Sequence, residues 1–127
     1  KNGWTIINDA YNASPMSMSA AITTLKDIAR GRRIAVLGDM LELGDYAAGA
    51  HRKVGEELAA SGADILLTRG ELSHSIAEAA KAGGMTEVYE CESHEAAAAK
   101  LKELLQAGDT ILFKGSRGMQ MEKIIYT

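Results

Sequence analysis

The sequence has 127 residues, of which 46% are hydrophobic and 24% are charged, and its formal net charge is −3. These values predict one globular domain, and the small negative charge argues against a nucleic-acid partner. The single cysteine excludes an internal disulfide, and no apolar run approaches the roughly 20 residues of a membrane-spanning helix. We therefore expect a cytoplasmic domain without membrane contact.

Short apolar runs alternate along the chain with segments of helical spacing. Strands are predicted at residues 4–7, 34–37, 63–68, 87–90 and 110–113, and helices at residues 16–30, 47–59, 72–82 and 94–106. The last segment, residues 119–126, suits either a strand or a helix, and we favour a helix. This alternation predicts an α/β fold, a Rossmann-like parallel or mostly parallel sheet of about five strands with helices on both faces. Spacing alone does not give the strand order.

The corner after the first predicted strand is polar. Ser14 falls at the N-cap of the next helix, and Pro15 falls at its first position. Free N–H groups and the positive end of the helix dipole then face Asp9, Tyr11 and Asn12. The sequence therefore predicts a corner that can hold an anion.

The helix that follows this corner has apolar residues at intervals of three and four. This spacing predicts one buried stripe, formed by Met18, Ala21, Ile22, Leu25 and Ile28. After it, the sequence Arg30-Gly31-Arg32 is interpreted as cations at a helix C-terminus beside a glycine cap, rather than as a binding patch.

A second polar loop, residues 38–44, follows the second predicted strand. Asp39 and Glu42 lie between glycines in this loop and could attract an amine or a cation. The other interpretation is that they cap the next helix locally. Both interpretations stay open at the level of the sequence.

The third polar loop, residues 114–118, follows the fifth predicted strand. Lys114, Ser116 and Arg117 supply two cations and a hydroxyl that could hold a carboxylate or a phosphate, and glycines allow close backbone approach. A solvated turn is the alternative. In a parallel sheet every strand-to-helix loop lies along the carboxyl edge, so we expect the three polar loops to share one edge.

The histidines and the cysteine give weaker signals. His51 and His94 fall where packing or capping is the default, and His74 shows no partner at metal-ligand spacing. Cys91 lies between two glutamates that would raise its pKa, which argues against a catalytic thiolate. We therefore predict no metal site.

Three stretches of the chain together resemble the Mur ligase family. Residues 9–18 read D-A-Y-N-A-S-P-M-S-M and resemble the family signature D-A-Y-N-A-N-P-x-S-M. Residues 37–44, with a histidine and an arginine at 51–52, and residues 113–122 agree in the same order. Ser14 stands where the signature has asparagine, and the helix start should be preserved because both residues are good N-caps.

The resemblance is nearest to the members that join D-alanyl-D-alanine to UDP-N-acetylmuramoyl-tripeptide in peptidoglycan synthesis. It implies that residues 1–127 are the C-terminal domain of a three-domain, ATP-dependent carbon–nitrogen ligase, inactive when isolated. Its partners would be the two substrates and the N-terminal and central domains. The central domain would supply the phosphate loop and most Mg²⁺ ligands, in line with the lack of a G-x-x-x-x-G-K-[ST] motif here.

The resemblance also implies roles by position. Asp9 would lie near the ribose of ATP and Asn12 near its phosphates, with Tyr11 shaping the pocket. The remaining candidates are Lys114, Ser116 and Arg117 beside the dipeptide or the developing phosphate charge, and Asp39 and Glu42 on the side of the amine.

Two alternatives stay open. The chain could be a free-standing α/β ligand-binding module without catalysis, since it lacks a complete catalytic set. It could also belong to a sibling ATP-dependent ligase with another amino-acid acceptor. The natural reading frame tests the first alternative: an upstream phosphate loop would favour the ligase, and a start codon beside Lys1 would favour the module. The second alternative is tested by finding which amine triggers phosphate release.

Overall fold

The computed structural model describes residues 3–10 and 13–125. Five strands form one sheet in the order β1-β5-β2-β3-β4, and every neighbouring pair is parallel. The strands are β1 Thr5–Asp9, β2 Arg33–Gly38, β3 Ile65–Arg69, β4 Val88–Cys91 and β5 Thr110–Lys114. The predicted parallel α/β fold is confirmed, and the structure adds the strand order.

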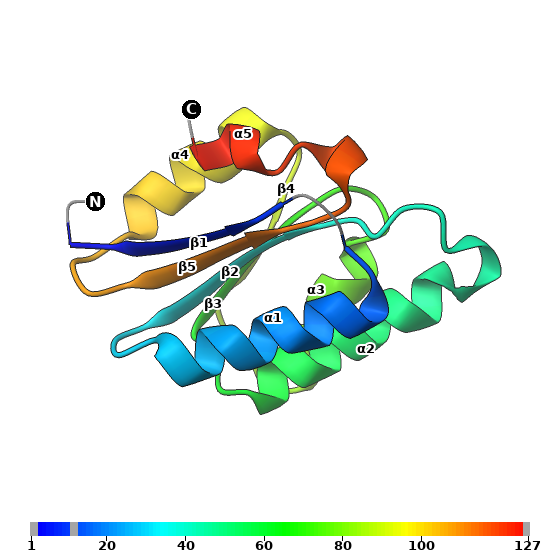
Figure 1. Cartoon of the computed structure of the whole chain (residues 1–127), viewed down its shortest axis with the longest axis horizontal. Coiled ribbons are helices and arrows are strands. Elements are labelled where there is room, and N and C mark those ends of the chain that lie inside the picture. Colours follow the sequence, from blue (N-terminus) through cyan, green and yellow to red (C-terminus); the bar gives the residue numbers. More distant parts are fainter. Residues whose placement is uncertain (1–2, 11–12, 126–127) are drawn as a thin grey trace.

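Helices cover both faces of the sheet (Figure 1). One face carries α1 Pro15–Ile28, α2 Ala47–Ala60 and α3 His74–Ala82, and the other carries α4 His94–Leu104 and α5 Glu122–Ile125. Short 3₁₀ turns precede α2 and α5, at Gly44–Tyr46 and Arg117–Met119. The helix favoured for the last segment is confirmed by α5.

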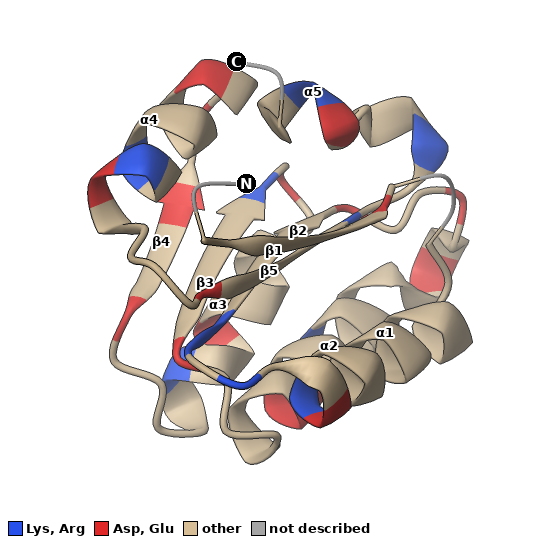
Figure 2. Cartoon of the chain, turned by 60° about the vertical axis from the view of Figure 1, so that its left-hand side comes forward, with Lys and Arg blue, Asp and Glu red and all other residues tan. Residues whose placement is uncertain are grey.

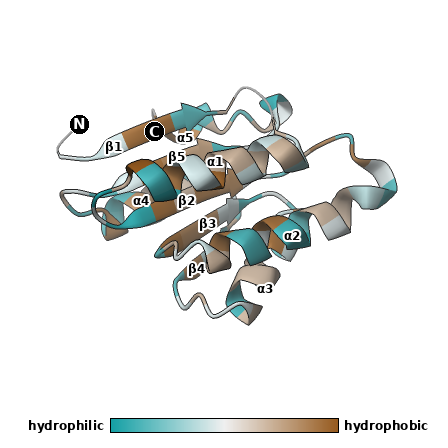
Figure 3. Ribbon diagram, turned by 60° about the horizontal axis from the view of Figure 1, so that its bottom comes forward, coloured by the Kyte–Doolittle hydropathy of each residue, from teal (hydrophilic) through white to brown (hydrophobic). Residues whose placement is uncertain are grey.

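The core is divided into two layers by the sheet. Along β2, Ala35 and Leu37 face the cluster formed with α1 to α3, whereas Ile34 and Val36 face the cluster formed with α4 and α5. Figure 3 shows the strands as a hydrophobic layer between helices. Because both of their faces are covered, the inner strands β2, β3 and β5 contain continuous apolar runs rather than alternating ones. Each fully buried aliphatic side chain contributes about 1.5–3 kcal/mol to folding.

The start of α1 follows the sequence prediction. Ser14 is the N-cap, and its side-chain oxygen accepts a hydrogen bond from the backbone N–H of Ser17 at 3.1 Å. The Ser17 hydroxyl oxygen accepts in return from the backbone N–H of Ser14 at 2.8 Å. Serine therefore takes the place that glutamate or glutamine usually has in a reciprocal capping box.

The end of α1 differs from the prediction. The helix stops at Ile28, which is 49% exposed and so does not belong to the buried stripe. Ala29 ends the helix in an extended conformation, and Gly31 does not adopt the left-handed conformation of a glycine cap. The arginine that follows, Arg32, is drawn away from the helix end by an ion pair with Asp109.

The strand order creates a place for a ligand at the carboxyl edge. β5 lies between β1 and β2, and the chain leaves β5 toward α5 on one face but leaves β1 and β2 toward α1 and α2 on the other (Figure 1). Such reversals are where ligands bind in open α/β sheets. The described parts of the three predicted polar loops border this reversal.

The surface carries charges of both signs. Figure 2 shows acidic and basic residues near one another on α4 and α5. In the described part of the chain, no helix combines the length and the apolar character needed to cross a membrane.

Candidate functional site

The carboxyl ends of β1 and β5 are joined by an ion pair. The ammonium nitrogen of Lys114 lies 2.8 Å from Oδ2 of Asp9, as expected for residues that are directly opposite in the β1–β5 register. The Lys114 side chain is only 2% exposed, whereas that of Asp9 is 47% exposed. A buried cation therefore holds a carboxylate that can still reach a ligand.

Asp39, after β2, anchors the loop between β3 and α3. Its carboxylate accepts hydrogen bonds from the backbone N–H and hydroxyl of Ser73, each at 2.7 Å, and from the N–H of Leu72 at 3.2 Å. Gly70 gives this carboxylate room, since a Cβ there would lie 2.4 Å from Asp39 Oδ1. The sequence left open that Asp39 caps the next helix, α2. The structure shows that Asp39 instead accepts from the N–H groups at the start of α3.

Sequence reasoning missed this fourth loop because residues 70–73 carry no motif of their own. The signal that could have found it is Ser73 directly before a helical segment, which needs an acceptor for its first N–H groups. A direct contact of Asp39 with a substrate amine stays a prediction.

Ser116 joins the loops after β2 and β5. Its hydroxyl oxygen accepts a hydrogen bond from the N–H of Leu41 at 2.7 Å, and its own N–H donates to the carbonyl of Asp39 at 2.9 Å. The residue is 7% exposed. A hydroxyl that accepts one hydrogen bond can still donate through its hydrogen. Ser116 is therefore part of the frame of the edge, and its catalytic role stays a prediction.

His51 holds the same loop from the side of α2. It is fully buried, and Nε2 accepts a hydrogen bond from the N–H of Met40 at 2.9 Å. Its Nδ1 lies 2.6 Å from the carbonyl of Ala47, which assigns the proton to Nδ1. The interpretation of His51 as a packed histidine is confirmed.

The remaining predicted site residues lie at the rim or outside the described residues. Glu42 is exposed and has a left-handed backbone with φ of 64°, and Arg117 is exposed at the start of the turn before α5. Tyr11 and Asn12 fall outside the described residues. The structure thus brings Asp9 and Lys114 together directly, and joins Asp39 and Ser116 through their backbones.

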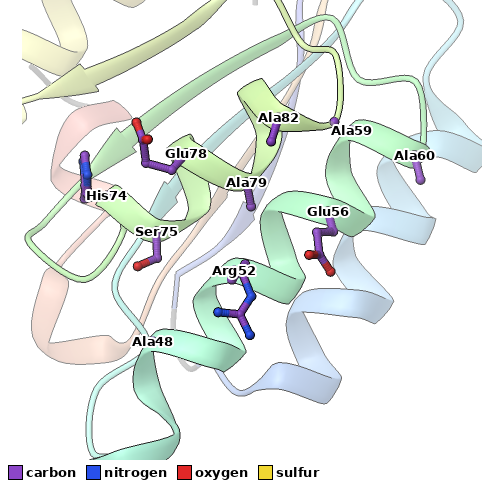
Figure 4. A pocket seen from close by; sticks show the side chains of 11 residues that line it. Ala48, Arg52, Glu56, Ala59, Ala60, His74, Ser75, Glu78, Ala79 and Ala82 are labelled. Carbon is purple, nitrogen blue, oxygen red and sulfur yellow. The ribbon is translucent and has the colours of Figure 1, made fainter.

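A cavity of about 290 Å³ lies beside the ion pair and is bordered by Asp9, Lys114 and Ser17. A larger one, about 650 Å³, lies between α2 and α3 (Figure 4). Its lining includes short side chains such as Ala79 and charged ones such as Arg52, and none of the predicted site residues. The polar residues of the carboxyl edge and the larger of these two cavities are therefore separate features.

Cys91 is not activated as a nucleophile. Burial raises the pKa of its thiol, and the nearby cations Arg69 and Lys100 oppose that shift only in part. The predicted direction is correct, but burial rather than the neighbouring glutamates is the cause.

The fold and the joined polar loops define a family. The sequence profile described as "Mur ligase, glutamate ligase domain" matches residues 1–117. The chain therefore belongs to the Mur ligase family.

Its relatives narrow the resemblance to one kind of ligase. The chain is 42% identical, over 98% of its length, to the UDP-N-acetylmuramoyl-tripeptide–D-alanyl-D-alanine ligase of Bacillus subtilis (strain 168). It is 38% identical, over 94% of its length, to the enzyme of that name from Escherichia coli (strain K12). It spans only 28% and 26% of those two proteins.

Solved structures agree. MurF from Acinetobacter baumannii superposes with a TM-score of 0.89 at 32% identity, and MurF from Thermotoga maritima in complex with ADP with a TM-score of 0.84 at 28% identity. In each case 99% of this chain and 28% of the other chain are covered. The resemblance deduced from the three stretches is confirmed.

Proposed function

We propose that this chain serves as the C-terminal domain of a MurF-type ligase, which joins D-alanyl-D-alanine to UDP-N-acetylmuramoyl-tripeptide. The observation that carries the proposal is the pairing of buried Lys114 with half-exposed Asp9, where two signature stretches meet. The names of the relatives support the assignment of the substrates. A cytoplasmic location fits the free Cys91 thiol.

The proposed reaction has two steps. The tripeptide carboxylate attacks the terminal phosphate of ATP, which yields an acyl phosphate and ADP. The amine of the dipeptide then attacks the acyl carbon, the amide bond forms, phosphate leaves, and the amine gives up a proton. An acyl phosphate is hydrolysable, so a domain that closes over it and excludes water protects the intermediate.

The geometry suggests distinct roles for the two cations of the third loop. Lys114 is buried, so it acts as a positioning residue that holds the Asp9 carboxylate toward the ribose hydroxyls of ATP. Arg117 is exposed at the rim, where a guanidinium can reach a substrate carboxylate or the developing phosphate charge. Ser116 and Asp39 hold the loops at the spacing that this arrangement needs.

Mg²⁺ does not fit the carboxylates of Asp9 and Asp39 at this edge. Asp9 is paired with an ammonium, and Asp39 accepts three hydrogen bonds from the β3–α3 loop. A magnesium ion is held by carboxylate oxygens that are open to it, together with substrate phosphates. We therefore place Mg²⁺ and most phosphate contacts on residues outside this chain, and expect the domain alone to bind ATP weakly.

The test is Asp9→Ala in the ligase that contains this domain. Phosphate release with D-alanyl-D-alanine should fall at least tenfold, which is about 1.4 kcal/mol of transition-state stabilisation. Asp27→Ala is the matched control, because Asp27 is an exposed aspartate near the end of α1, and it should leave the rate unchanged. Wild-type turnover in Asp9→Ala would contradict the proposal. If another amino acid, and not the dipeptide, triggers phosphate release, the domain belongs to a sibling ligase.

A further inference from the structure

Three side chains with metal-binding atoms converge between α3 and the edge strand β4. They are His74, Glu78 and Glu90, and one ligand atom of each lies within 4.8 Å of the others. Among the described residues, this is the one group of three histidine, cysteine or acidic side chains with such geometry. The first two line the end of the α2–α3 cavity, where Figure 4 shows them on α3.

The fold brings these residues together for simple reasons. His74 and Glu78 are four positions apart on α3, so they lie on one face of the helix. Glu90 is two residues after Val88 on β4, and Val88 packs in the cluster that contains α3, so both side chains point to the face that α3 covers. The prediction that His74 lacks a partner at metal-ligand spacing was wrong, since Glu78 is in range and Glu90 arrives from another element.

Hydrogen bonds and ion pairs hold these three side chains together. His74 Nδ1 lies 2.7 Å from Glu90 Oε1, and this contact raises the pKa of the imidazole. The ammonium of Lys81 lies 3.7 Å from a carboxylate oxygen of Glu78 and 3.7 Å from one of Glu90. Lys81 is 46% exposed, so it can turn into solvent and leave both carboxylates to another cation.

We propose that His74, Glu78 and Glu90 form a binding site for a divalent transition-metal ion of the Zn²⁺ type. One imidazole nitrogen and two carboxylate oxygens are ligands that Zn²⁺ accepts, and water completes the tetrahedron of an exposed site. Tetrahedral ligands at about 2.1 Å from zinc lie roughly 3.4 Å apart, so the exposed side chains need only small rotations. The imidazole selects against Mg²⁺, which prefers oxygen ligands.

The bound ion would connect α3 to β4. β4 is an edge strand that pairs with β3 alone, so a metal bridge would fix the strand at a point where the sheet supplies few bonds. Binding to the folded state only would stabilise it in proportion to metal concentration. This site is independent of the Asp9–Lys114 edge.

The experiment titrates Zn²⁺ into the protein by calorimetry, at a pH well above the raised pKa of His74 so that the imidazole is neutral, and follows the melting temperature. One Zn²⁺ per chain and a higher melting temperature are expected, with no heat from Mg²⁺. His74→Ala and Glu90→Gln should each weaken Zn²⁺ binding at least tenfold. Lys81→Ala should strengthen it, because the competing ammonium is gone.

His94→Ala is the matched control, because His94 lies at the start of α4 and bonds the carbonyl of Met119 instead. It should leave the Zn²⁺ affinity unchanged. The proposal is overturned if Zn²⁺ gives no heat in the wild-type protein. It is equally overturned if His74→Ala and Glu90→Gln bind as tightly as the wild type, since the metal would then lie elsewhere.

Discussion

The two edges of the sheet each carry an ion pair, and the pairs are built in opposite ways. At the carboxyl edge, the cation of Lys114 is buried and the carboxylate of Asp9 is 47% exposed. At the amino edge, where the strands begin, Arg32 precedes β2 and Asp109 precedes β5. There the carboxylate of Asp109 is buried, at 2% exposed, and the cation of Arg32 is 29% exposed. The first pair presents a carboxylate to solvent, whereas the second encloses one.

The bonding of the amino-edge pair is also closed. Arg32 donates through Nε and Nη2 to the two oxygens of Asp109, at 3.0 and 2.8 Å, and through Nη2 to the carbonyl of Leu104 at 2.7 Å. The N–H of Gln106 donates to Asp109 as well. A bidentate pair with additional backbone bonds is a stabilising arrangement. The comparison teaches that an ion pair indicates a ligand site only when one partner remains available.

The largest effect is expected from opening the closed pair. Arg32→Met leaves the Asp109 carboxylate buried without its main partner, which should lower the free energy of unfolding by about 3 kcal/mol. Denaturant unfolding of the wild type and the variant measures the difference. Arg30→Met, an exposed neighbour, should change stability by less than about 0.5 kcal/mol. Equal stability of Arg32→Met and wild type would show that the enclosed pair contributes nothing.

A smaller effect is expected at the junction of the carboxyl-edge loops. Ser116→Ala leaves the N–H of Leu41 without its acceptor and should destabilise the domain by about 1–3 kcal/mol. Chemical denaturation provides the value. Ser75→Ala, at a partly buried serine on α3, serves as the control. If Ser116→Ala is as stable as Ser75→Ala, Ser116 does not help to hold the loops of this edge together.

The N-cap of α1 should contribute about 1 kcal/mol. Ser14→Ala removes the oxygen that accepts from the Ser17 N–H, whereas Ser14→Asn should retain stability because asparagine is a good cap. Thermal unfolding of both variants checks this. Equal loss in the two variants would mean that the capping bond is not the reason for serine here.

The last effect appears only in acid, where the carboxylate of Asp109 takes up a proton. Burial raises the pKa of this carboxyl, but hydrogen bonds from Arg32 and from the Gln106 N–H outweigh it, so the pKa is lowered overall. The stabilisation is therefore present above the ordinary carboxyl pKa of about 3.9 and is lost as the pH falls through the lowered value. Acid unfolding should separate the wild type from Asp109→Asn above that range, and the two curves should converge below it. Curves that stay parallel throughout would contradict the assignment.

Local signals in the sequence predicted local structure well. Ser14 and Pro15 correctly predicted the start of α1. Short apolar runs correctly predicted five parallel strands, whose polar loops share an edge. The bonds that join Asp39 to Ser73 and His74 to Glu90 could not be predicted, because they depend on which strands and helices become neighbours. The exposure of Ile28 depends in the same way on where the helix leaves the sheet.

The most direct test of the contrast between the edges is the turnover of the ligase carrying Lys114→Met, measured beside the stability of the same variant. The Asp9 carboxylate is half exposed and stays solvated when methionine replaces Lys114, so the free energy of unfolding should change by less than about 1 kcal/mol. Turnover should nevertheless fall at least tenfold, because Asp9 loses its orientation. Wild-type turnover in Lys114→Met would contradict the account, and so would a loss of activity that merely follows a loss of folding.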